Sequence, residues 1–183
     1  MRIVIEGPDG SGKSTLLNQF RERYSKLEMV PRACTSEHGP IDDLAGWVNE
    51  DFVSRTRGYW IYDRHPMISE LIYSPAMGRD MNPQFQNKMW LSSAMGQFHS
   101  RGYYVIICLP PFEEVRDNVN ANHGGTDHQD GVWANLKTIW NLYFIEQARR
   151  FNEPRSWVWD YTNMNFETSR MVDVFDSILR PFS

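Results

Sequence analysis

The sequence has 183 residues, of which 41% are hydrophobic and 14% aromatic, and this predicts one globular domain over residues 1–183. The formal net charge of −4 argues against an overall basic surface for nucleic acid, but not against a local basic groove. Cys34 and Cys108 form no C-x-x-C pair, which predicts two free thiols rather than a disulfide framework or a metal site. The first predicted strand starts at once, and no apolar run approaches the roughly 18 residues of a membrane span. We therefore expect a cytoplasmic protein with no membrane partner.

A stretch near the N-terminus carries the strongest motif. The β-branched run Arg2–Glu6 is typical of a buried parallel strand, and helical spacing follows at Leu16, Leu17, Phe20 and Tyr24. Between them, Gly7-Pro-Asp-Gly-Ser-Gly-Lys-Ser-Thr15 contains G-x-x-x-x-G-K-[ST], the phosphate-binding P-loop. In such a loop, backbone N–H groups and the helix N-terminus bind anions, Lys13 reaches the β- and γ-phosphates, and Ser14 ligates Mg²⁺. We predict ATP and Mg²⁺ as cofactors, with ATP held by Gly7, Asp9, Gly10, Ser11, Gly12, Lys13, Ser14 and Thr15.

The rest of the chain alternates strands and helices. Further strands are expected at 27–33, 59–62, 103–109 and 156–159, the first of these short or at an edge because of Pro31. Helices are expected at 41–53, from Pro66 through Ile72, and at 84–100, 112–120, 132–151 and 166–179, with loops at 74–83 and 122–131. This alternation predicts an α/β fold with three α/β/α layers on a five-stranded parallel sheet.

Apolar stripes on two of these helices predict faces that pack inward. The stripes are Phe85, Met89, Trp90, Met95 and Phe98 on 84–100, and Trp133, Leu136, Ile139, Trp140, Tyr143 and Phe144 on 132–151. They also leave a homodimer open, although a core role is the more frequent one for such stripes.

Polar and proline residues follow several of the predicted strands. They are Asp9, Arg32, Asp63, Arg64, Pro110 and Asp160. Because right-handed crossovers place ligand sites at the carboxyl ends of parallel strands, we expect these residues to meet at one rim of the sheet.

Several of these segments resemble the thymidylate kinase family. Ile5–Thr15 resembles the opening of that family, and Asp63-Arg64-His65 resembles its D-R-[YH] motif. Leu109-Pro-Pro111, followed by Arg116 and a polar loop, resembles the approach to the family's lid, and Asp160-Tyr-Thr162 resembles the residues after its last strand. The resemblance spans nearly the whole chain. It implies a P-loop kinase fold with a short lid at about 120–131, and transfer of the γ-phosphoryl of ATP to a deoxynucleoside monophosphate.

The resemblance also implies roles for single residues. Asp9 would face the sugar of the acceptor nucleotide, with an Asx-type turn contact as the alternative. Arg64 would hold the acceptor phosphate, with a strand-end salt bridge as the alternative. Asp63 would order a Mg²⁺-bound water, so that Ser14 and Asp63 form the metal set, or act as general base toward a hydroxyl acceptor. Arg32 would complete the acceptor set of Asp9, Asp63 and Arg64. The catalytic candidates are Lys13, Asp9, Asp63, Arg64 and Arg116. Of these, Arg116 could stack on adenine or reach a phosphate.

Two departures from the family pattern leave the acceptor open. The usual R-E-P-G continuation after the second strand is replaced by Arg32-Ala-Cys-Thr35. The expected lid contains no Arg or Lys between Asn120 and Val132, where His123 and His128 are the basic residues. These histidines could contact phosphate, lie in solvent or take part in a metal site.

Three functions therefore stay open. A phosphotransferase that acts on a deoxynucleoside monophosphate is the leading one. A kinase for a hydroxyl acceptor would act on a deoxynucleoside or a hydroxymethylated pyrimidine, free or in DNA, and the net charge does not favour DNA. A nucleotide-binding module without phosphotransfer is the third.

Overall fold

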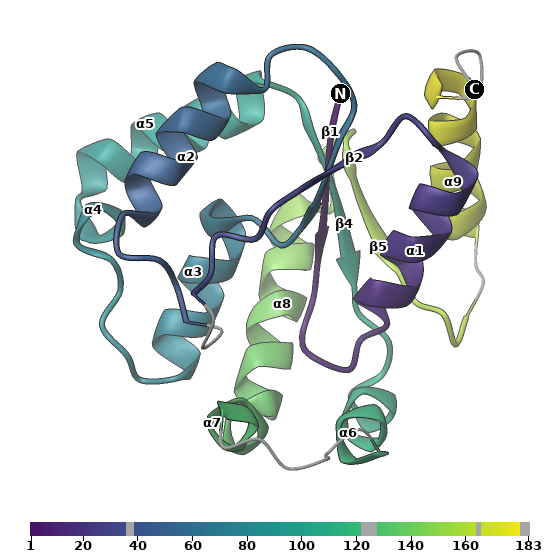
Figure 1. Ribbon diagram of the computed structural model, residues 1–183. Helices are drawn as coiled ribbons and strands as arrows, with labels where there is room; N and C mark the ends of the chain where they lie inside the picture. Colours follow the sequence, from purple (N-terminus) through teal and green to yellow (C-terminus); the bar gives the residue numbers. More distant parts are fainter. Residues whose placement is uncertain (36–38, 122–127, 164–165, 180–183) are drawn as a thin grey trace.

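The sheet of this protein is five-stranded and fully parallel, as the sequence predicts (Figure 1). It is seen in a computed structural model that describes residues 1–35, 39–121, 128–163 and 166–179. The strands are β1 (Arg2–Glu6), β2 (Glu28–Val30), β3 (Trp60–Asp63), β4 (Tyr103–Cys108) and β5 (Ser156–Trp159), in the order β2-β3-β1-β4-β5. Pro31 follows the short edge strand β2, in agreement with the expectation for that segment.

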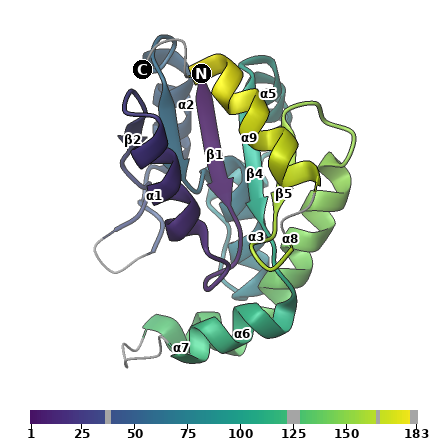
Figure 2. The same cartoon turned by 90° about the vertical axis from the view of Figure 1, so that its right-hand side faces the viewer.

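Helices cover both faces of the sheet and complete the three layers (Figure 1). One face carries α1 (Lys13–Arg23) and α9 (Phe166–Leu179). The other face carries α2 (Leu44–Ser54), α3 (Pro66–Ala76), α4 (Pro83–Gln86), α5 (Lys88–Ser100) and α8 (Leu136–Arg150). Two further helices, α6 (Phe112–Ala121) and α7 (His128–Ala134), lie beyond the carboxyl ends of the strands (Figures 1 and 2). The predicted α/β/α fold is confirmed.

The core lies in two halves, one on each side of the sheet. Val4 and Ile107 face the larger half, beneath α2, α3, α5 and α8, while Ile5 and Ile106 face the half beneath α1 and α9. Because the central strands are covered on both faces, their sequences are continuous apolar runs rather than alternating ones. At about 25 cal/mol per Å², burial of such side chains is the main force that stabilises the sheet.

Two helices that were expected to be continuous are interrupted. The expected helix 84–100 is broken at Asn87, whose side chain accepts hydrogen bonds from the N–H groups of Met89 and Trp90 and so caps α5. Likewise, α7 ends before Asn135 and α8 begins after it. The expected loop 122–131 is also partly wrong, because the chain is helical from His128 onward and residues 122–127 lie outside the described part. In contrast, α3 continues past its expected end, through Pro75 to Ala76.

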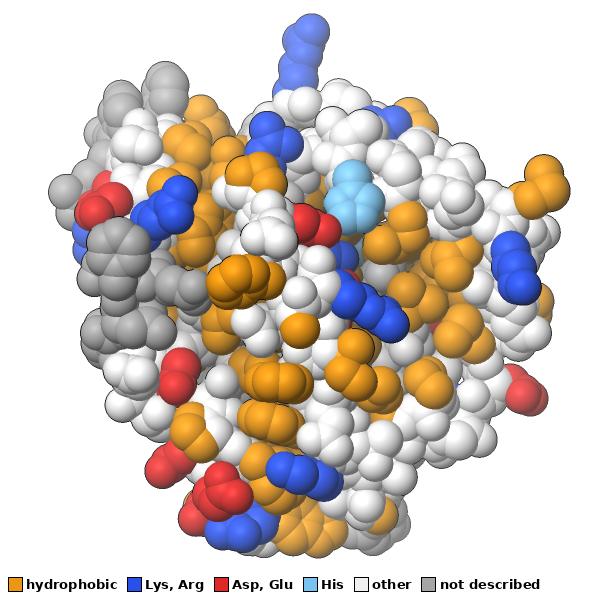
Figure 3. Space-filling view, turned by 180° about the vertical axis from the view of Figure 1, so that it is seen from behind, with side chains coloured by type: hydrophobic (Ala, Val, Ile, Leu, Met, Phe, Trp, Pro, Cys, Tyr) orange, Lys and Arg blue, Asp and Glu red, His pale blue; other side chains and the backbone are white. Residues whose placement is uncertain are grey.

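The predicted inward stripes are only partly correct. Phe85, Phe98, Leu136, Ile139 and Tyr143 are buried. Met89 and Phe144 are 85% and 52% exposed, so their predicted inward orientation is wrong. Phe144 instead stacks on Trp140, with ring centroids 5.6 Å apart. The face opposite to that seen in Figure 1 likewise shows hydrophobic side chains among charged ones (Figure 3). Within the described ranges, no helix is both long and apolar enough to cross a membrane.

Candidate active site

The glycine-rich loop between β1 and α1 has a backbone that requires glycine. Gly10 and Gly12 adopt φ angles of 77° and 82°, in the left-handed region that side chains disfavour. A Cβ atom on Gly10 would lie 2.7 Å from the carbonyl oxygen of Val115, and one on Gly12 would lie 2.9 Å from the Trp159 ring. The loop leads directly into the first turn of α1, so backbone N–H groups and the positive end of a helix come together there.

Lys13 is buried at the base of this loop. Its Nζ atom donates a hydrogen bond of 2.6 Å to the carbonyl oxygen of Pro8. Burial lowers the pKa of Lys13 to about 8 and the nearby charge of Arg64 adds to this effect, while Asp9 and Asp63 oppose it. The amine therefore stays mostly protonated at neutral pH. Ser14 and Thr15, the next two residues of the motif, are exposed on the first turn of α1.

Asp9 is held by two side chains from beyond β3. One Asp9 oxygen accepts a 2.8 Å bond from Nη2 of Arg64, and the other accepts a 3.0 Å bond from the Tyr73 hydroxyl. The Arg64 guanidinium also lies over the Tyr73 ring, 4.4 Å from its centroid. Burial opposes ionisation of Asp9, but the charges of Arg64 and Lys13 outweigh it and lower the pKa of the carboxyl. The salt bridge considered as the alternative for Arg64 is therefore present, with Asp9 as its partner.

The backbone of Arg64 is strained. Its φ angle is 71°, a conformation that is rare for residues other than glycine and costs about 1–3 kcal/mol. Two hydrogen bonds hold the turn. The Arg64 N–H donates to the carbonyl of Ile5 at 2.9 Å, and the His65 N–H donates to the buried Glu6 carboxylate at 2.7 Å. The turn after β3 thereby brings the Arg64 side chain to the loop after β1.

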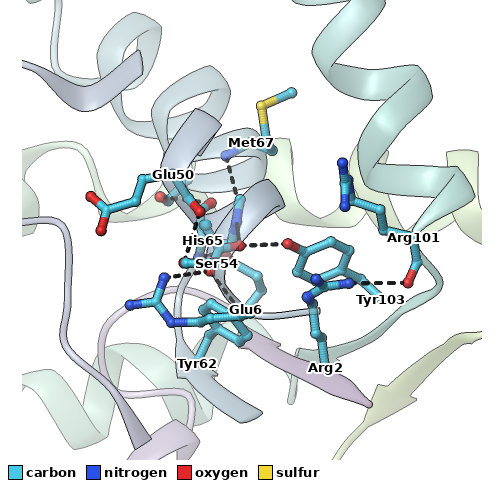
Figure 4. Close-up of polar contacts among 12 residues, drawn as sticks. Arg2, Glu6, Glu50, Ser54, Tyr62, His65, Met67, Arg101 and Tyr103 are labelled. Atoms are coloured by element: carbon cyan, nitrogen blue, oxygen red, sulfur yellow. Dashed lines mark hydrogen bonds and ion pairs between the residues drawn. The ribbon is translucent and has the colours of Figure 1, made fainter. Parts of the chain in front are cut away.

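A buried polar network holds His65 in the turn after β3 (Figure 4). Its centre is Asp51 on α2, which is fully buried and lies within hydrogen-bond distance, 3.3 Å, of Nε2 of His65. The other groups that donate to Asp51 are Arg55, Tyr62 and Tyr103. Because Nδ1 of His65 accepts from the Met67 N–H, its Nε2 atom carries the hydrogen. Burial lowers the pKa of His65, so the ring is neutral at pH 7. Sequence reasoning missed Asp51, since its position on an amphipathic helix gives no sign of burial.

Asp63 and Arg32 form a second ion pair at the same rim. Nη2 of Arg32 lies 2.9 Å from Oδ2 of Asp63, which ends β3. The other oxygen, Oδ1, is buried and has no hydrogen-bond partner among the described residues. Such an orphaned carboxylate oxygen has the chemistry that Mg²⁺ or a Mg²⁺-bound water requires. No cluster of three or more His, Cys, Asp or Glu side chains occurs in the part of the chain that the structure describes. A Mg²⁺ ion here would thus depend on phosphate and water for most of its ligands.

These acidic and basic residues line one cavity. Its volume is about 640 Å³, and Asp9, Arg32, Asp63 and Arg64 all contribute to its wall. Further wall residues come from α2, α3, the segment after α3, α6 and α7, and sequence reasoning had not singled out the following ones as site residues. They include Leu44, Glu70, Tyr73, Met77, Arg79, Asn118 and Val132. All four expected acceptor-site residues are therefore brought together, and their roles stay predictions.

Other expected site residues are not part of this cavity wall. The Pro110 carbonyl accepts from the Trp140 indole, and Asp160 accepts from the N–H and hydroxyl of Thr162. Arg116 is exposed and pairs with Asp117, its sequence neighbour. His123 lies outside the described residues, and of His128 only the backbone is described.

The architecture recurs in known structures over nearly the whole chain. It matches a deoxyadenosine kinase from M. mycoides with bound dCTP, at a TM-score of 0.57 and 14% identity over 97% of this chain and 100% of that one. It matches the YorR protein of Bacillus subtilis, in complex with phosphorylated GDP, at a TM-score of 0.61 and 14% identity over 100% of this chain and 99% of that one. It also matches thymidylate kinase from Candida albicans at a TM-score of 0.54 and 17% identity over 97% of this chain and 91% of that one. The chain has the fold of the P-loop nucleoside and nucleotide kinases. No family model matches the sequence, and no curated protein matches it significantly.

Proposed function

We propose that this protein is a kinase that transfers the γ-phosphoryl group of ATP to a deoxynucleoside monophosphate. The observation that carries this proposal is the position of Arg64. Its guanidinium lies 2.8 Å from Asp9 of the phosphate loop and also lines the cavity that extends away from the loop. Arg64 would thus be a fixed cation between the proposed donor loop and the proposed acceptor cavity, where two phosphate groups would have to approach each other.

The donor side would use the loop and the first turn of α1. Backbone N–H groups of Gly7–Thr15 would bind the phosphates, and Lys13 would exchange its bond to the Pro8 carbonyl for one to phosphate. The Ser14 hydroxyl and, through water, Oδ1 of Asp63 would hold Mg²⁺, which would supply positive charge to the donor phosphates. Catalysis of this kind depends on positioning and charge rather than on covalent chemistry.

The pairing of the two carboxylates supports a phosphate rather than a hydroxyl as the acceptor. A hydroxyl acceptor needs a general base within hydrogen-bond reach. Oδ2 of Asp63 is paired with Arg32, and both oxygens of Asp9 already accept hydrogen bonds. Oδ1 of Asp63 has no partner among the described residues, but it is the oxygen proposed here for a Mg²⁺-bound water and would not be free to act as a base. An anionic acceptor instead needs donors, and Arg32 and Arg64 both line the cavity.

The test is phosphoryl transfer from labelled ATP to separate pools of deoxynucleosides, deoxynucleoside monophosphates and oligonucleotides. Transfer to the monophosphate pool, abolished by Lys13→Ala and lowered but not eliminated by Asp63→Asn, is the expected result, because the amide oxygen of asparagine could still accept from a Mg²⁺-bound water. Transfer to nucleosides or oligonucleotides that Asp63→Asn eliminates would instead identify a hydroxyl kinase. No transfer in any pool would leave a nucleotide-binding module.

A further inference from the structure

A third ion pair, between Glu70 on α3 and Arg79 after that helix, lines the cavity wall, and neither residue has a role in the donor chemistry. Nη2 and Nη1 of Arg79 donate to the two oxygens of Glu70 at 2.6 and 3.2 Å. The Glu70 side chain is only 2% exposed, whereas that of Arg79 is 33% exposed, and both residues line the cavity. The buried Glu70 side chain therefore anchors the pair, while the Arg79 side chain remains accessible.

The hydrogen-bonding capacity of Glu70 is already used. Its Oε1 atom accepts from Nη1 of Arg79 and from the N–H of Asn82 at 2.9 Å, and its Oε2 atom accepts from Nη2 of Arg79. A carboxylate engaged in this way offers little to a ligand. Its effect is to hold the Arg79 guanidinium by the edge formed by Nη1 and Nη2.

The other edge of the Arg79 guanidinium carries two further donors. A guanidinium has five N–H groups in one plane. Nη1 donates to Glu70 and more weakly, at 3.5 Å, to the Asp80 carbonyl, and Nη2 donates one of its hydrogens to Glu70. The Nε–H and the second Nη2–H have no acceptor among the residues that the structure describes. These two groups point in the same direction, so they form a fork suited to two adjacent acceptor atoms.

Helix α3 separates this fork from the phosphate end of the cavity. Arg64 precedes the helix and Arg79 follows it, and 11 residues at 1.5 Å each make α3 about 16 Å long. One face of α3 lines the cavity between the two arginines, at Pro66, Ser69, Glu70 and Tyr73, and Met77 continues this wall just after the helix. A monophosphate bound to Arg64 would therefore direct its base along this wall toward Arg79.

From this arrangement, and resting on the proposed function, we propose that Arg79, positioned by Glu70, reads the base of the acceptor nucleotide. Because the fork consists of two donors, the base it selects has two adjacent acceptors on one edge. Guanine presents O6 and N7, and cytosine presents O2 and N3. Thymine and adenine alternate acceptor and donor along their outer edges, so each could satisfy only one arm of the fork. The enzyme then prefers dCMP or dGMP over dTMP and dAMP.

The test measures kcat/KM for dCMP, dGMP, dTMP and dAMP at saturating ATP, with the wild type and Arg79→Lys. Lysine keeps the charge but is a point donor, so it loses the fork. We expect a loss of roughly tenfold to a hundredfold for the preferred substrate, the discrimination that a bidentate contact to a base provides. The values for dTMP and dAMP and the KM for ATP should change less than about threefold. Between dCMP and dGMP, the better substrate identifies the base.

Two further variants sharpen the result. Glu70→Gln keeps the side-chain volume but places an amide NH₂ opposite the N–H donors of Arg79. This variant should raise the KM for the preferred monophosphate with little change in kcat. Arg23→Lys is the matched control, because Arg23 also forms a bidentate pair, with Asp176, and neither residue lies in the cavity wall. This control should leave all four substrates unchanged. If Glu70→Gln does not fold, Arg79→Lys decides alone.

Failure of this proposal is distinguishable from failure of the proposed function. A wild-type preference for dTMP or dAMP, or an equal loss for all four substrates in Arg79→Lys, would overturn the role of Arg79 and leave the kinase assignment standing. If no monophosphate is phosphorylated, calorimetry can still measure how tightly the same four compounds bind. Tighter binding of dCMP or dGMP that Arg79→Lys removes would support the base-reading fork, and equal binding of all four would refute it.

Discussion

Substitution of Asp51 by alanine should destabilise the protein more than removal of any exposed acid. Asp51 is fully buried and pairs with His65, Arg55, Tyr62 and Tyr103. Without the carboxylate, the two tyrosine hydroxyls and Nε2 of His65 would remain in the interior without an acceptor. The Arg55 side chain is 21% exposed and can turn to solvent.

The magnitude follows from these unpaired groups. Each buried polar group left without a partner costs about 1–3 kcal/mol, and three such groups would remain in this variant. We therefore expect the free energy of unfolding of Asp51→Ala to fall by about 3 kcal/mol or more. Urea titration followed by tryptophan fluorescence measures this change. Asp117→Ala is the control, because it removes an exposed pair with Arg116 and should cost no more than about 0.5 kcal/mol. A loss below about 1 kcal/mol for Asp51→Ala would refute the argument that the network is fully desolvated.

Three further predictions concern the loop and its supports. Gly10→Ala should lower the free energy of unfolding by about 2–4 kcal/mol, because it adds left-handed backbone strain and a clash with Val115. Gly78→Ala, with φ of 61° and open space around it, is the control and should cost about 1 kcal/mol. Equal losses in urea titrations of the two variants would contradict the predicted clash at Gly10. Tyr73→Phe removes the hydroxyl bond to Asp9 but keeps the ring beneath Arg64, so steady-state kinetics should show a several-fold higher KM for the acceptor at an unchanged KM for ATP. Burial raises the pKa of Glu6 from 4.5 to about 7, so the stability associated with its protonated form is present below pH 4.5 and is lost as the pH rises through 7. The stability of wild type relative to Glu6→Gln should therefore fall by about 3 kcal/mol between pH 4.5 and 8, and a flat difference would refute it.

Local patterns in the sequence determined the elements whose physics is local. The strand, glycine loop and helix at residues 2–24 follow from hydrophobic spacing and from backbone conformations that glycine permits, and β5 and α9 have the predicted bounds. Continuous apolar runs indicated strands covered on both faces, and a parallel sheet places its strand ends at one rim. Asp9, Arg32, Asp63 and Arg64 were expected at that rim for this reason, and they do line one cavity.

The tertiary structure alone decided which polar side chains are paired. Asp51 and His65 lie 14 residues apart, and Tyr143 donates to Glu6 across 137 residues, so no local pattern connects them. The same applies to the outward orientation of Met89 and Phe144, because helical spacing defines a stripe but not which neighbouring element covers each position. The fork of Arg79 depends on how Glu70 holds it at the cavity wall. Burial and pairing are properties of the packed chain, and at this site they determine what each charged group can still bind.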